Sequence, residues 1–562
     1  MKVIIVGGVA GGASCAARLR RLDERAEILL IERGPYVSYA NCGLPYHVGD
    51  VIQKESRLLV ASEKLFRENF AIDVRTGCEA VGIAPKEKQL TVRDVKTGDI
   101  AVLPYDKLVL SPGAASVRPP LPGIDLPGIF HVRTIPDARA IRDWIERGSE
   151  FLTGMHRYSG FQTVKPNARA VVVGGGFIGL EMVENLVHRG FDVTLVEMLD
   201  QVLPPVDREE ARAVEAHLRR HGVHLALGDG VAAFRAAAHG AIDVETKGGK
   251  IHPADLVILA LGVRPDTTLA RTAGLRLGEC GGIHVDDRMR TSDPDIFAVG
   301  DAIEVADFVT GERSLVALAG PANRQGRIAA DVIAGRNSRY RGTQGTAIVG
   351  LFGAVIAWTG ASEKTLKRLG HTDWEKIYLY PNSHAGYYPG AKPIAMKVLF
   401  RKSDGLLLGA QALGEDGVEK RIDTLAAMIQ MHATVYDLEE AELCYAPPFG
   451  SAKDPVNFAG MVAADVLRGD MPVSHWTSLD DGFLLDVRDP VELAVEHVPE
   501  AVNIPLAGLR ARLGELPRDR EIQVICRSGQ RAYVAASMLL QNGFKARTIS
   551  GGMLSRAQNF LL

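Results

Sequence analysis

Short apolar runs followed by glycine turns and helical patterns recur along the first half of the chain. Residues 3–6 form such a run, GGVAGG interrupts it, and ASCAARLRRL follows with apolar positions at helical spacing. The same order returns in RAVVVGGGFIGLEMVENL. A continuous apolar run bounded by a turn is consistent with a buried strand. The pattern therefore predicts two strand–turn–helix units.

The glycines of these turns predict two dinucleotide sites. The first glycine of such a motif permits the tight turn, the last lets the helix pack on the strand, and the helix N-terminus holds a pyrophosphate. In the first turn Gly7 and Gly12 occupy the outer positions of G-x-G-x-x-G, and Val9 replaces the middle glycine. An ordinary tight turn that binds no nucleotide is the alternative for this first motif. The second turn is complete, with Gly174, Gly176 and Gly179.

Carboxylates follow both turns at the spacing of ribose ligands. Glu32 ends AEILLIE and Glu197 closes DVTLVE, where a carboxylate accepts hydrogen bonds from a ribose diol. Glu197 is followed by Met198 and Leu199 and by no Arg, which favours NADH over NADPH. Further along, TSDPDIFAVGDA places Asp301 where it could bond the ribityl hydroxyls of a flavin or cap a helix.

Length and composition set the frame for these motifs. A chain of 562 residues is too long for one hydrophobic core, and about 150 residues per domain predicts three or four units. With 46% hydrophobic and 24% charged residues, it has the composition of an ordinary globular protein. The net charge of -3 comes from mixed acidic and basic residues, which argues against a nucleic-acid partner.

The cysteines and the longest uncharged segment indicate in which cellular compartment the protein is expected. The six cysteines lie far apart and lack the spacing of a disulfide framework or a zinc site, so we expect free thiols in a reducing cytoplasm and no bound metal. The opening MKVIIVGGVA runs into glycines and an Arg-rich helical pattern, unlike an export signal. Residues 342–362 contain five glycines and predict sheet strands instead of a membrane span.

Five motifs in sequence carry a family resemblance. They are GGVAGG, LVLSPGA, GGGFIG, LVILALGVRPD and TSDPDIFAVGDA. In this order they resemble the two-dinucleotide flavoprotein disulfide reductases, in which an NAD module is inserted into an FAD module. The resemblance covers most of residues 1–330. It implies that the first turn and Asp301 hold FAD and that the second turn holds NADH, with NADPH as the alternative.

Cys42 lacks the partner that most members of this family have. Their two cysteines are separated by four residues, whereas the positions five away from Cys42 are Val37 and His47. Cys42 must therefore exchange with a peroxide, a small-molecule disulfide or a persulfide from outside. The resemblance implies that Cys42 starts a helix facing the flavin, and we expect both to favour the thiolate. A buried, inert cysteine is the alternative.

Three further segments narrow the resemblance. Flavin peroxidases and water-forming NADH oxidases usually carry a His in the first glycine turn, where this chain has Ala10. YVSYANCGLPYHVGD, SHAGYYPGAKP and ELCYAPPFGSAKDPVN look like coenzyme A disulfide reductases, and the whole chain is similar to NADH-dependent persulfide reductases. This resemblance implies that two residues near the thiol contact coenzyme A and that two arginines on the first helix bind its phosphates. For each arginine, a position on a solvated helix face is the alternative. The residues are Ser38, Asn41, Arg18 and Arg21.

Two tyrosines imply a shared site. Tyr388 and Tyr445 match tyrosines that the family sends across a dimer interface toward the active thiol, where a phenol could donate a hydrogen bond to a leaving thiolate. Ordinary packing is the alternative for each. The resemblance therefore implies a homodimer whose active site is completed across the interface.

The C-terminal stretch carries a second thiol site. In EIQVICRSGQRAYVAASMLLQNGF a strand ends at Cys526, a loop holds Gly529, and Arg531 opens a helix, so backbone N–H groups would point at one sulfur. The pattern is similar to rhodanese domains, including residues of the preceding segment, although Glu496 stands where the family usually has Gly. The loop is shorter than that of related phosphatases, which favours sulfur transfer. The preceding residues are Asp486, Arg488, His497 and Asn503.

The predicted architecture is α/β: two interleaved Rossmann-like domains, an α+β dimerisation domain and a C-terminal α/β rhodanese domain. The expected bounds are 1–113 with 250–320 for FAD, 114–249 for NAD, 321–468 for dimerisation and 472–562 for rhodanese. Residues 147–167 are expected to form a surface connection.

The predicted function is FAD-dependent reduction of persulfide, polysulfide or coenzyme A disulfide by NADH, with release of sulfide or free coenzyme A. The direction of sulfur flow between Cys526 and Cys42 stays open. Two alternatives remain: a flavin NADH oxidase or peroxidase with an accessory rhodanese domain, and a sulfur- or redox-sensing carrier.

Overall fold

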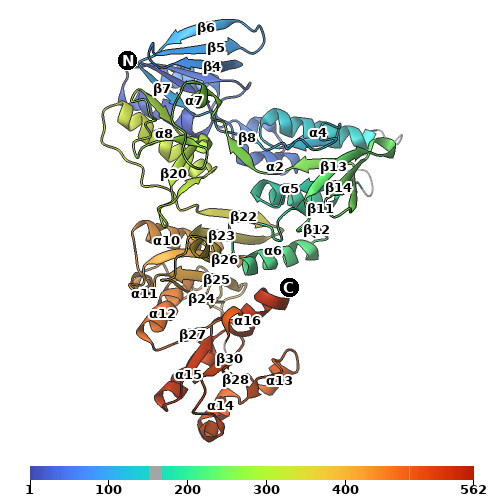
Figure 1. Cartoon of the computed structure of the whole chain (residues 1–562), viewed down its shortest axis with the longest axis vertical. Coiled ribbons are helices and arrows are strands. Elements are labelled where there is room, and N and C mark those ends of the chain that lie inside the picture. The colour runs from blue at the N-terminus through green and yellow to red at the C-terminus, as the bar shows by residue number, and fades with distance from the viewer. Residues whose placement is uncertain (151–167, 480, 562) are drawn as a thin grey trace. The chain divides into compact units, whose positions relative to one another are not determined.

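The computed structural model describes residues 1–150, 168–479 and 481–561. The chain divides into two compact units: unit 1 combines Met1–Asp200 with Gly222–Thr343, and unit 2 combines Gln201–His221 with Gln344–Leu562 (Figure 1). Of the predicted surface connection, residues 151–167 lie outside the described part. Among the described residues, no helix combines the length and apolar character needed to cross a membrane.

Unit 1 contains a five-stranded parallel sheet in the order β19-β7-β1-β2-β3. Helix α1 (Ala10–Leu22) follows β1 and packs against α8 (Ala319–Ile333). A Cβ on Gly326 would lie 2.1 Å from the carbonyl oxygen of Gly11, so the two helices touch backbone to backbone. The strands are β1 (Lys2–Val6), β2 (Glu27–Glu32), β3 (Asp73–Thr76), β7 (Lys107–Leu110) and β19 (Ile296–Ala298).

The second parallel sheet of unit 1 has the order β12-β11-β10-β16-β9, and α5 (Phe177–His188) follows β10. Strand β16 (Leu256–Leu259) lies between β10 and β9. The expected return to the FAD domain at residue 250 is therefore too early, because an apolar run does not encode which sheet it joins. The other strands are β9 (Ile129–His131), β10 (Arg169–Val173), β11 (Asp192–Glu197) and β12 (His224–Leu227).

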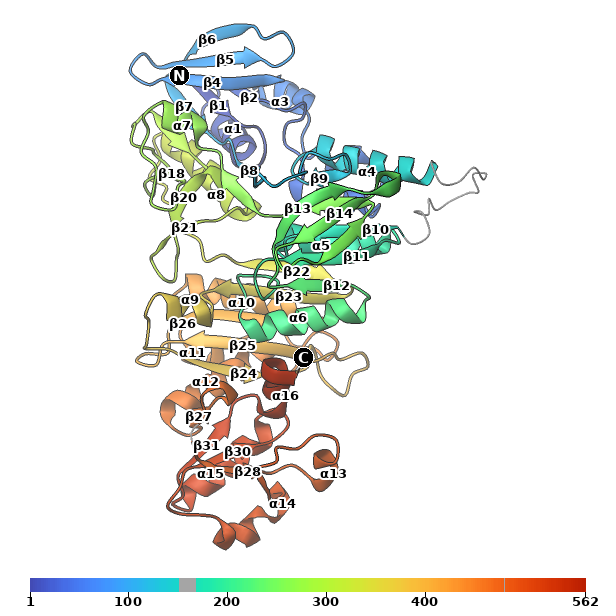
Figure 2. The same ribbon diagram turned by 45° about the vertical axis from the view of Figure 1, so that its right-hand side comes forward.

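Unit 2 begins with an antiparallel sheet in the order β22-β23-β26-β25-β24, against which α10 (Val418–Gln430) packs (Figure 2). The strands expected in residues 342–362 are β22 and β23. Helix α6 (Arg208–Arg220), expected in the NAD domain, belongs to unit 2, and α8 lies in unit 1 although the dimerisation domain was expected from residue 321. The strands are β22 (Ala347–Leu351), β23 (Ala354–Gly360), β24 (Glu375–Leu379), β25 (Ile394–Phe400) and β26 (Leu407–Gly414).

Unit 2 ends in a small parallel sheet in the order β27-β31-β30-β28-β29. Helix α15 (Gln530–Gln541) follows β30, and α16 (Gly552–Arg556) follows β31. Two interleaved parallel sheets, an antiparallel domain and this last α/β domain confirm the predicted fold class. The strands are β27 (Val473–Ser474), β28 (Phe483–Asp486), β29 (Val502–Asn503), β30 (Ile522–Ile525) and β31 (Ala546–Ile549).

Candidate functional site

The first glycine turn is built as its spacing predicts. Gly7 has a φ of 95°, in the region that favours glycine. A Cβ on Gly12 would lie 1.8 Å from the carbonyl oxygen of Gly7, so only glycine lets α1 start so close to β1. The carboxylate of Glu32 accepts hydrogen bonds from the backbone N–H groups of Gly8 at 2.9 Å and Gly34 at 2.7 Å. Glu32 thus ties β2 to the turn.

The second turn repeats this construction. Gly174 has a φ of 110°, and a Cβ on Gly179 would lie 1.9 Å from the carbonyl oxygen of Gly174. A Cβ on Gly176 would meet no heavy atom within 4 Å, so the middle of this turn is open. The carboxylate of Glu197 accepts hydrogen bonds from the N–H groups of Gly175 at 2.6 Å and Leu199 at 2.7 Å. Both turns can therefore present amides to a phosphate.

A cavity of about 1350 Å³ in unit 1 joins the first turn to the predicted thiol. Typical pockets for small ligands measure roughly 300–1000 Å³, so this one suits a larger molecule such as a dinucleotide. Asp301 lines it and is held by Arg133 at 2.9 Å. The lining includes Gly7, Arg18, Arg21, Glu32, Ser38, Asn41 and Cys42. The residues assigned to FAD in the first turn and those assigned to coenzyme A therefore share one cavity.

Cys42 lies in the short turn Asn41–Gly43 before α2 (Leu44–Val48). Its thiol is free and reachable from the cavity. The surrounding walls displace water, which raises the pKa of Cys42, and the charges of Glu181 and Asp301 raise it further. The protein around Cys42 therefore favours the neutral thiol overall, and the expected preference for the Cys42 thiolate does not come from these side chains.

Glu181 and Tyr46 were not singled out from the sequence. Glu181 lies on α5, and desolvation raises its pKa to about 7. The Tyr46 hydroxyl donates to Glu181 Oε1 at 3.4 Å. The available signal was a carboxylate within the first two turns of a mostly apolar helix after a glycine motif. The pair places a titratable carboxyl group near Cys42.

The two predicted phosphate ligands differ in their surroundings. Arg18 donates to Asp331 at 2.7 Å, whereas the guanidinium of Arg21 lies 5.4 Å from the ring centre of Phe70. Both line the cavity. Arg18 is thus paired with a carboxylate, whereas Arg21 lies against an aromatic ring.

Tyr445 pairs with Tyr387, a tyrosine that was not singled out from the sequence. The hydroxyl of Tyr445 lies 2.7 Å from that of Tyr387, not that of Tyr388. The ring of Tyr388 instead meets His384 edge-on at 5.7 Å. Tyr387 and Tyr388 are adjacent in the sequence, so only the loop conformation decides which hydroxyl reaches Tyr445.

Cys526 directly follows β30, the central strand of the C-terminal sheet, and only 1% of the residue is exposed. Its Sγ accepts a hydrogen bond from the N–H of Gly529 at 3.1 Å, and Gly529 adopts a φ of 100° as the residue before α15. Arg531 forms a fork with Glu492, with contacts of 2.6 and 2.8 Å. The chain from Cys526 to Arg531 thus forms a loop between β30 and α15, and Arg531, the second residue of α15, faces a carboxylate.

The segment preceding this loop also forms a frame. The buried Arg488 makes an ion pair with Asp486 at 2.7 Å. The amide of Asn503 donates to the carbonyl oxygens of both residues at 2.9 Å. These contacts hold the end of β28 beside β29.

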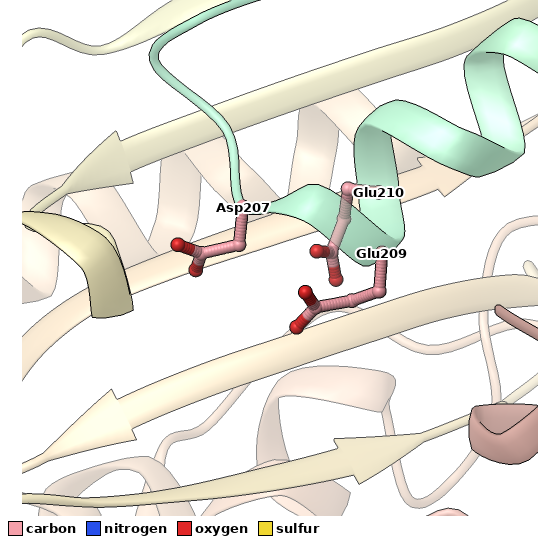
Figure 3. A group of neighbouring side chains, drawn as sticks. All are labelled: Asp207, Glu209 and Glu210. Carbon is pink, nitrogen blue, oxygen red and sulfur yellow. The ribbon is translucent and has the colours of Figure 1, made fainter. Parts of the chain in front are cut away.

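One group of three acidic side chains among the described residues is compact enough to hold a metal ion. Figure 3 shows Asp207, Glu209 and Glu210 gathered at the start of α6. The ammonium of Lys397 donates to Asp207 at 2.9 Å and also to Glu209. A buried cation thus already occupies this group, which we interpret as an ion-pair network.

Comparison with known families matches the architecture domain by domain. A model of pyridine nucleotide-disulphide oxidoreductases matches residues 1–326, and their dimerisation domain matches residues 346–455. A rhodanese-like domain matches residues 472–557.

Individual proteins similar to this chain carry the names of three different activities. The structure of reduced Bacillus anthracis CoADR-RHD is 45% identical, covers 99% of this chain and 98% of its own, and has a TM-score of 0.94. A NAD-dependent persulfide reductase from A. fulgidus is 35% identical, covers 99% and 100%, and has a TM-score of 0.88. A coenzyme A disulfide reductase of Staphylococcus haemolyticus is 33% identical, covering 83% and 100%. An NADH oxidase of Methanocaldococcus jannaschii is 34% identical, covering 83% and 99%.

Proposed function

Because the chain belongs to the pyridine nucleotide-disulphide oxidoreductase family, which uses a flavin and a nicotinamide nucleotide, we propose that it is an FAD-dependent enzyme that uses NADH to reduce S–S bonds. Its substrates are a persulfide, a polysulfide or coenzyme A disulfide, and Cys526 handles sulfane sulfur. One observation carries the proposal: Cys42 is a free thiol facing a cavity of dinucleotide size. The six free thiols support a reducing cytoplasm.

The residues of the two turns fit the cofactors. Gly7, Gly12 and Glu32 would hold the pyrophosphate and ribose of FAD, and Asp301 its ribityl chain. When bound, the flavin supplies two-electron transfer between nicotinamide and sulfur. The second turn would hold NADH, and the absence of Arg directly after Glu197 supports NADH over NADPH. Its residues are Gly174, Gly176, Gly179 and Glu197.

Cys42 provides the covalent step. Its thiolate attacks one sulfur of coenzyme A disulfide, forms a Cys42–S–S–coenzyme A bond and releases one coenzyme A thiolate. Two electrons from NADH then cleave that bond, which restores Cys42 and releases the second coenzyme A. With a coenzyme A persulfide the first leaving group is hydrosulfide. The balance is then NADH, a proton and the persulfide giving NAD⁺, free coenzyme A and hydrogen sulfide.

The cavity wall supports a coenzyme A site. Asn41 Oδ1 is buried and has no hydrogen-bond partner among the described residues, so a ligand donor would satisfy it. Ser38 lies beside it on the wall. Arg21, with Arg18, would hold the phosphates.

The exposed tyrosines support a homodimer. A matching dimerisation domain covers residues 346–455, and the side chains of Tyr387, Tyr388 and Tyr445 are exposed in the single chain. We propose that the hydroxyl pair of Tyr387 and Tyr445 acts across the interface at the reactive thiol, with Tyr388 beside it. A phenol there can protonate a leaving thiolate.

Anaerobic turnover of synthetic coenzyme A persulfide and of coenzyme A disulfide with NADH tests the proposal and ranks the substrates. We expect sulfide from the first, free coenzyme A from both, and no turnover in Cys42→Ala. Sulfide formation that survives Cys42→Ala would overturn the proposal.

The similarity to an NADH oxidase keeps one alternative in view. Ala10 lacks the side chain that could protonate peroxide beside the thiol, so we expect NADH oxidation by oxygen or peroxide to be slower than reduction of coenzyme A disulfide. Faster consumption of oxygen or peroxide that survives Cys526→Ser would favour an oxidase or peroxidase. Negligible turnover with every S–S substrate would favour a sensor or carrier.

A further inference from the structure

The edge of the antiparallel sheet in unit 2 supports the loop behind Cys526. Strand β24 is the last strand of that sheet, so its outward backbone groups need partners from elsewhere. The N–H of Tyr378 donates to Ser550 Oγ at 3.0 Å. Ser550 is 3% exposed and directly precedes Gly551 and Gly552. The C-terminal domain therefore satisfies an edge N–H of the dimerisation sheet.

The two glycines are confined between Tyr378 and Cys526. A Cβ on Gly551 would lie 2.7 Å from the Cβ of Tyr378, and one on Gly552 would lie 2.2 Å from the carbonyl oxygen of Cys526. Both glycines have positive φ. The backbone of Gly551 and Gly552 therefore fills the space between Tyr378 and the carbonyl group of Cys526. In such close packing, a displacement of Tyr378 would displace the two glycines and, through them, Cys526.

The Cys526 peptide depends on this layer for its hydrogen bonds. The N–H of Met553 donates to the carbonyl oxygen of Cys526 at 2.9 Å, and that of Leu554 donates to Arg527 at 3.0 Å. The hydroxyl of Ser555 contacts the carbonyl oxygen of Ser550 at 2.7 Å. Residues 550–555 thus form the rear support of the loop that aims the Gly529 N–H at the sulfur.

Tyr378 is itself held by buried charges. Its hydroxyl donates at 2.6 Å to Oε1 of Glu209, one of the three carboxylates in Figure 3. Lys397, its cross-strand partner, places its ammonium 5.4 Å from the ring centre. His475, which pairs with Glu375 at 2.9 Å, meets the ring edge-on at 6.1 Å. Tyr378 therefore has little freedom to move.

We propose that Tyr378 is a positioning residue for Cys526, so that the dimerisation sheet sets the geometry of sulfur transfer in the C-terminal domain. This inference rests on the proposed role of Cys526 as the sulfur carrier. It adds that the C-terminal domain does not reach full activity by its own contacts. In this proposal the buried charge network of α6 and β25 holds Tyr378 in place, and the loop from Cys526 to Arg531 takes its position from Tyr378.

Sulfur transfer from thiosulfate to cyanide by the full-length holoenzyme tests the proposal. Ser550→Ala removes the acceptor of the Tyr378 N–H, and we expect kcat to fall about tenfold with KM for thiosulfate unchanged, because a displacement of about 1 Å can cost up to roughly 100-fold in rate. Tyr378→Ala keeps the N–H and the Cβ but loses the ring that contacts Lys397 and His475, so residue 378 can shift and we expect a smaller fall in kcat, about threefold. Tyr378→Phe, which keeps the ring and the N–H, should stay within about twofold of the native enzyme.

Tyr380→Phe is the matched control. The hydroxyl of Tyr380 donates to Gln558 at 2.6 Å, so this variant loses a contact between the same domains without touching residues 550–552. Thermal melting shows whether each variant is folded, and reduction of coenzyme A disulfide reports on Cys42 independently. Ser550→Ala with the kcat of Tyr380→Phe, or with a changed KM only, would overturn the positioning role. Transfer that survives Cys526→Ser would instead refute the sulfur-carrier function.

Discussion

Cys42 and Cys526 show two ways of presenting a reactive sulfur. Cys42 faces an open cavity and has the carboxyl groups of Glu181 and Asp301 as electrostatic neighbours. Cys526 is 1% exposed and receives a backbone N–H from its own loop. The first environment is acidic and open to a large ligand. The second is closed and built from backbone dipoles.

The two thiols therefore depend on different parts of the chain. Around Cys42 the chain raises the pKa, so the negative form must gain its stability from a bound partner. Around Cys526 the support is local and geometric, and the loop depends on the packing behind it.

Removal of Cys526 and removal of Cys42 should each abolish a different one of the two reactions. In Cys526→Ser we expect sulfur transfer from thiosulfate to cyanide to fall at least about 1000-fold, while reduction of coenzyme A disulfide by NADH stays within about twofold. In Cys42→Ser the losses should be reversed. Parallel assays of both reactions on each variant are the measurement. Loss of both reactions in either variant would show that the thiols act as one site.

Gly529→Ala should disable the closed site selectively. An L side chain is strained at a φ of 100°, so the loop must shift and the N–H leaves the sulfur. We expect sulfur transfer to fall about 100-fold. Gly508→Ala in the same domain is the control, because its Cβ would meet no heavy atom within 4 Å. Equal activities of the two variants would contradict the geometric support of Cys526.

Glu181→Gln should change the open site by charge alone. The carboxylate raises the pKa of Cys42, so a neutral amide should move the pH profile of Cys42 alkylation to lower pH and speed alkylation several-fold at neutral pH. Peptide mapping of the iodoacetamide-treated holoenzyme measures this. Glu27→Gln, on the exposed end of β2, is the control. A profile that stays in place or moves to higher pH would rule out the electrostatic link.

The ion pair beside Cys526 should contribute least. Arg531 lowers the pKa of Glu492, so its stabilising effect is fully present above the ordinary glutamate pKa of about 4.3 and is lost as pH falls through the lower pKa of the folded state. Since both side chains are about one-third exposed, we expect less than about 1 kcal/mol. Urea unfolding of Glu492→Gln at pH 7 and pH 3 should show a larger difference from the native enzyme at pH 7 than at pH 3. An equal difference at both values would exclude the ion pair as its source.

Most local features of both sites follow from the sequence. Gly12 and Gly179 have to be glycine because a Cβ would collide with a carbonyl oxygen one turn earlier, and such constraints leave a readable spacing. Gly529 is recognisable because its φ of 100° favours glycine, and Cys526 because it stands three residues before that glycine at the end of an apolar run. Glu181 and Tyr46 gave no such signal, since they meet across two helices from positions 135 residues apart.

The two glycine turns, the isolation of Cys42 and the order of the domains can be read from the amino-acid sequence, because these features depend on neighbours along the chain. Four features depend instead on long-range packing: β16 joins the second sheet, α6 belongs to unit 2, Tyr387 reaches Tyr445, and Tyr378 lies behind the Cys526 loop. Those contacts join positions far apart in sequence or depend on the path of one loop. Their physical cause is packing and hydrogen-bond satisfaction at close range, which no local pattern of residues records.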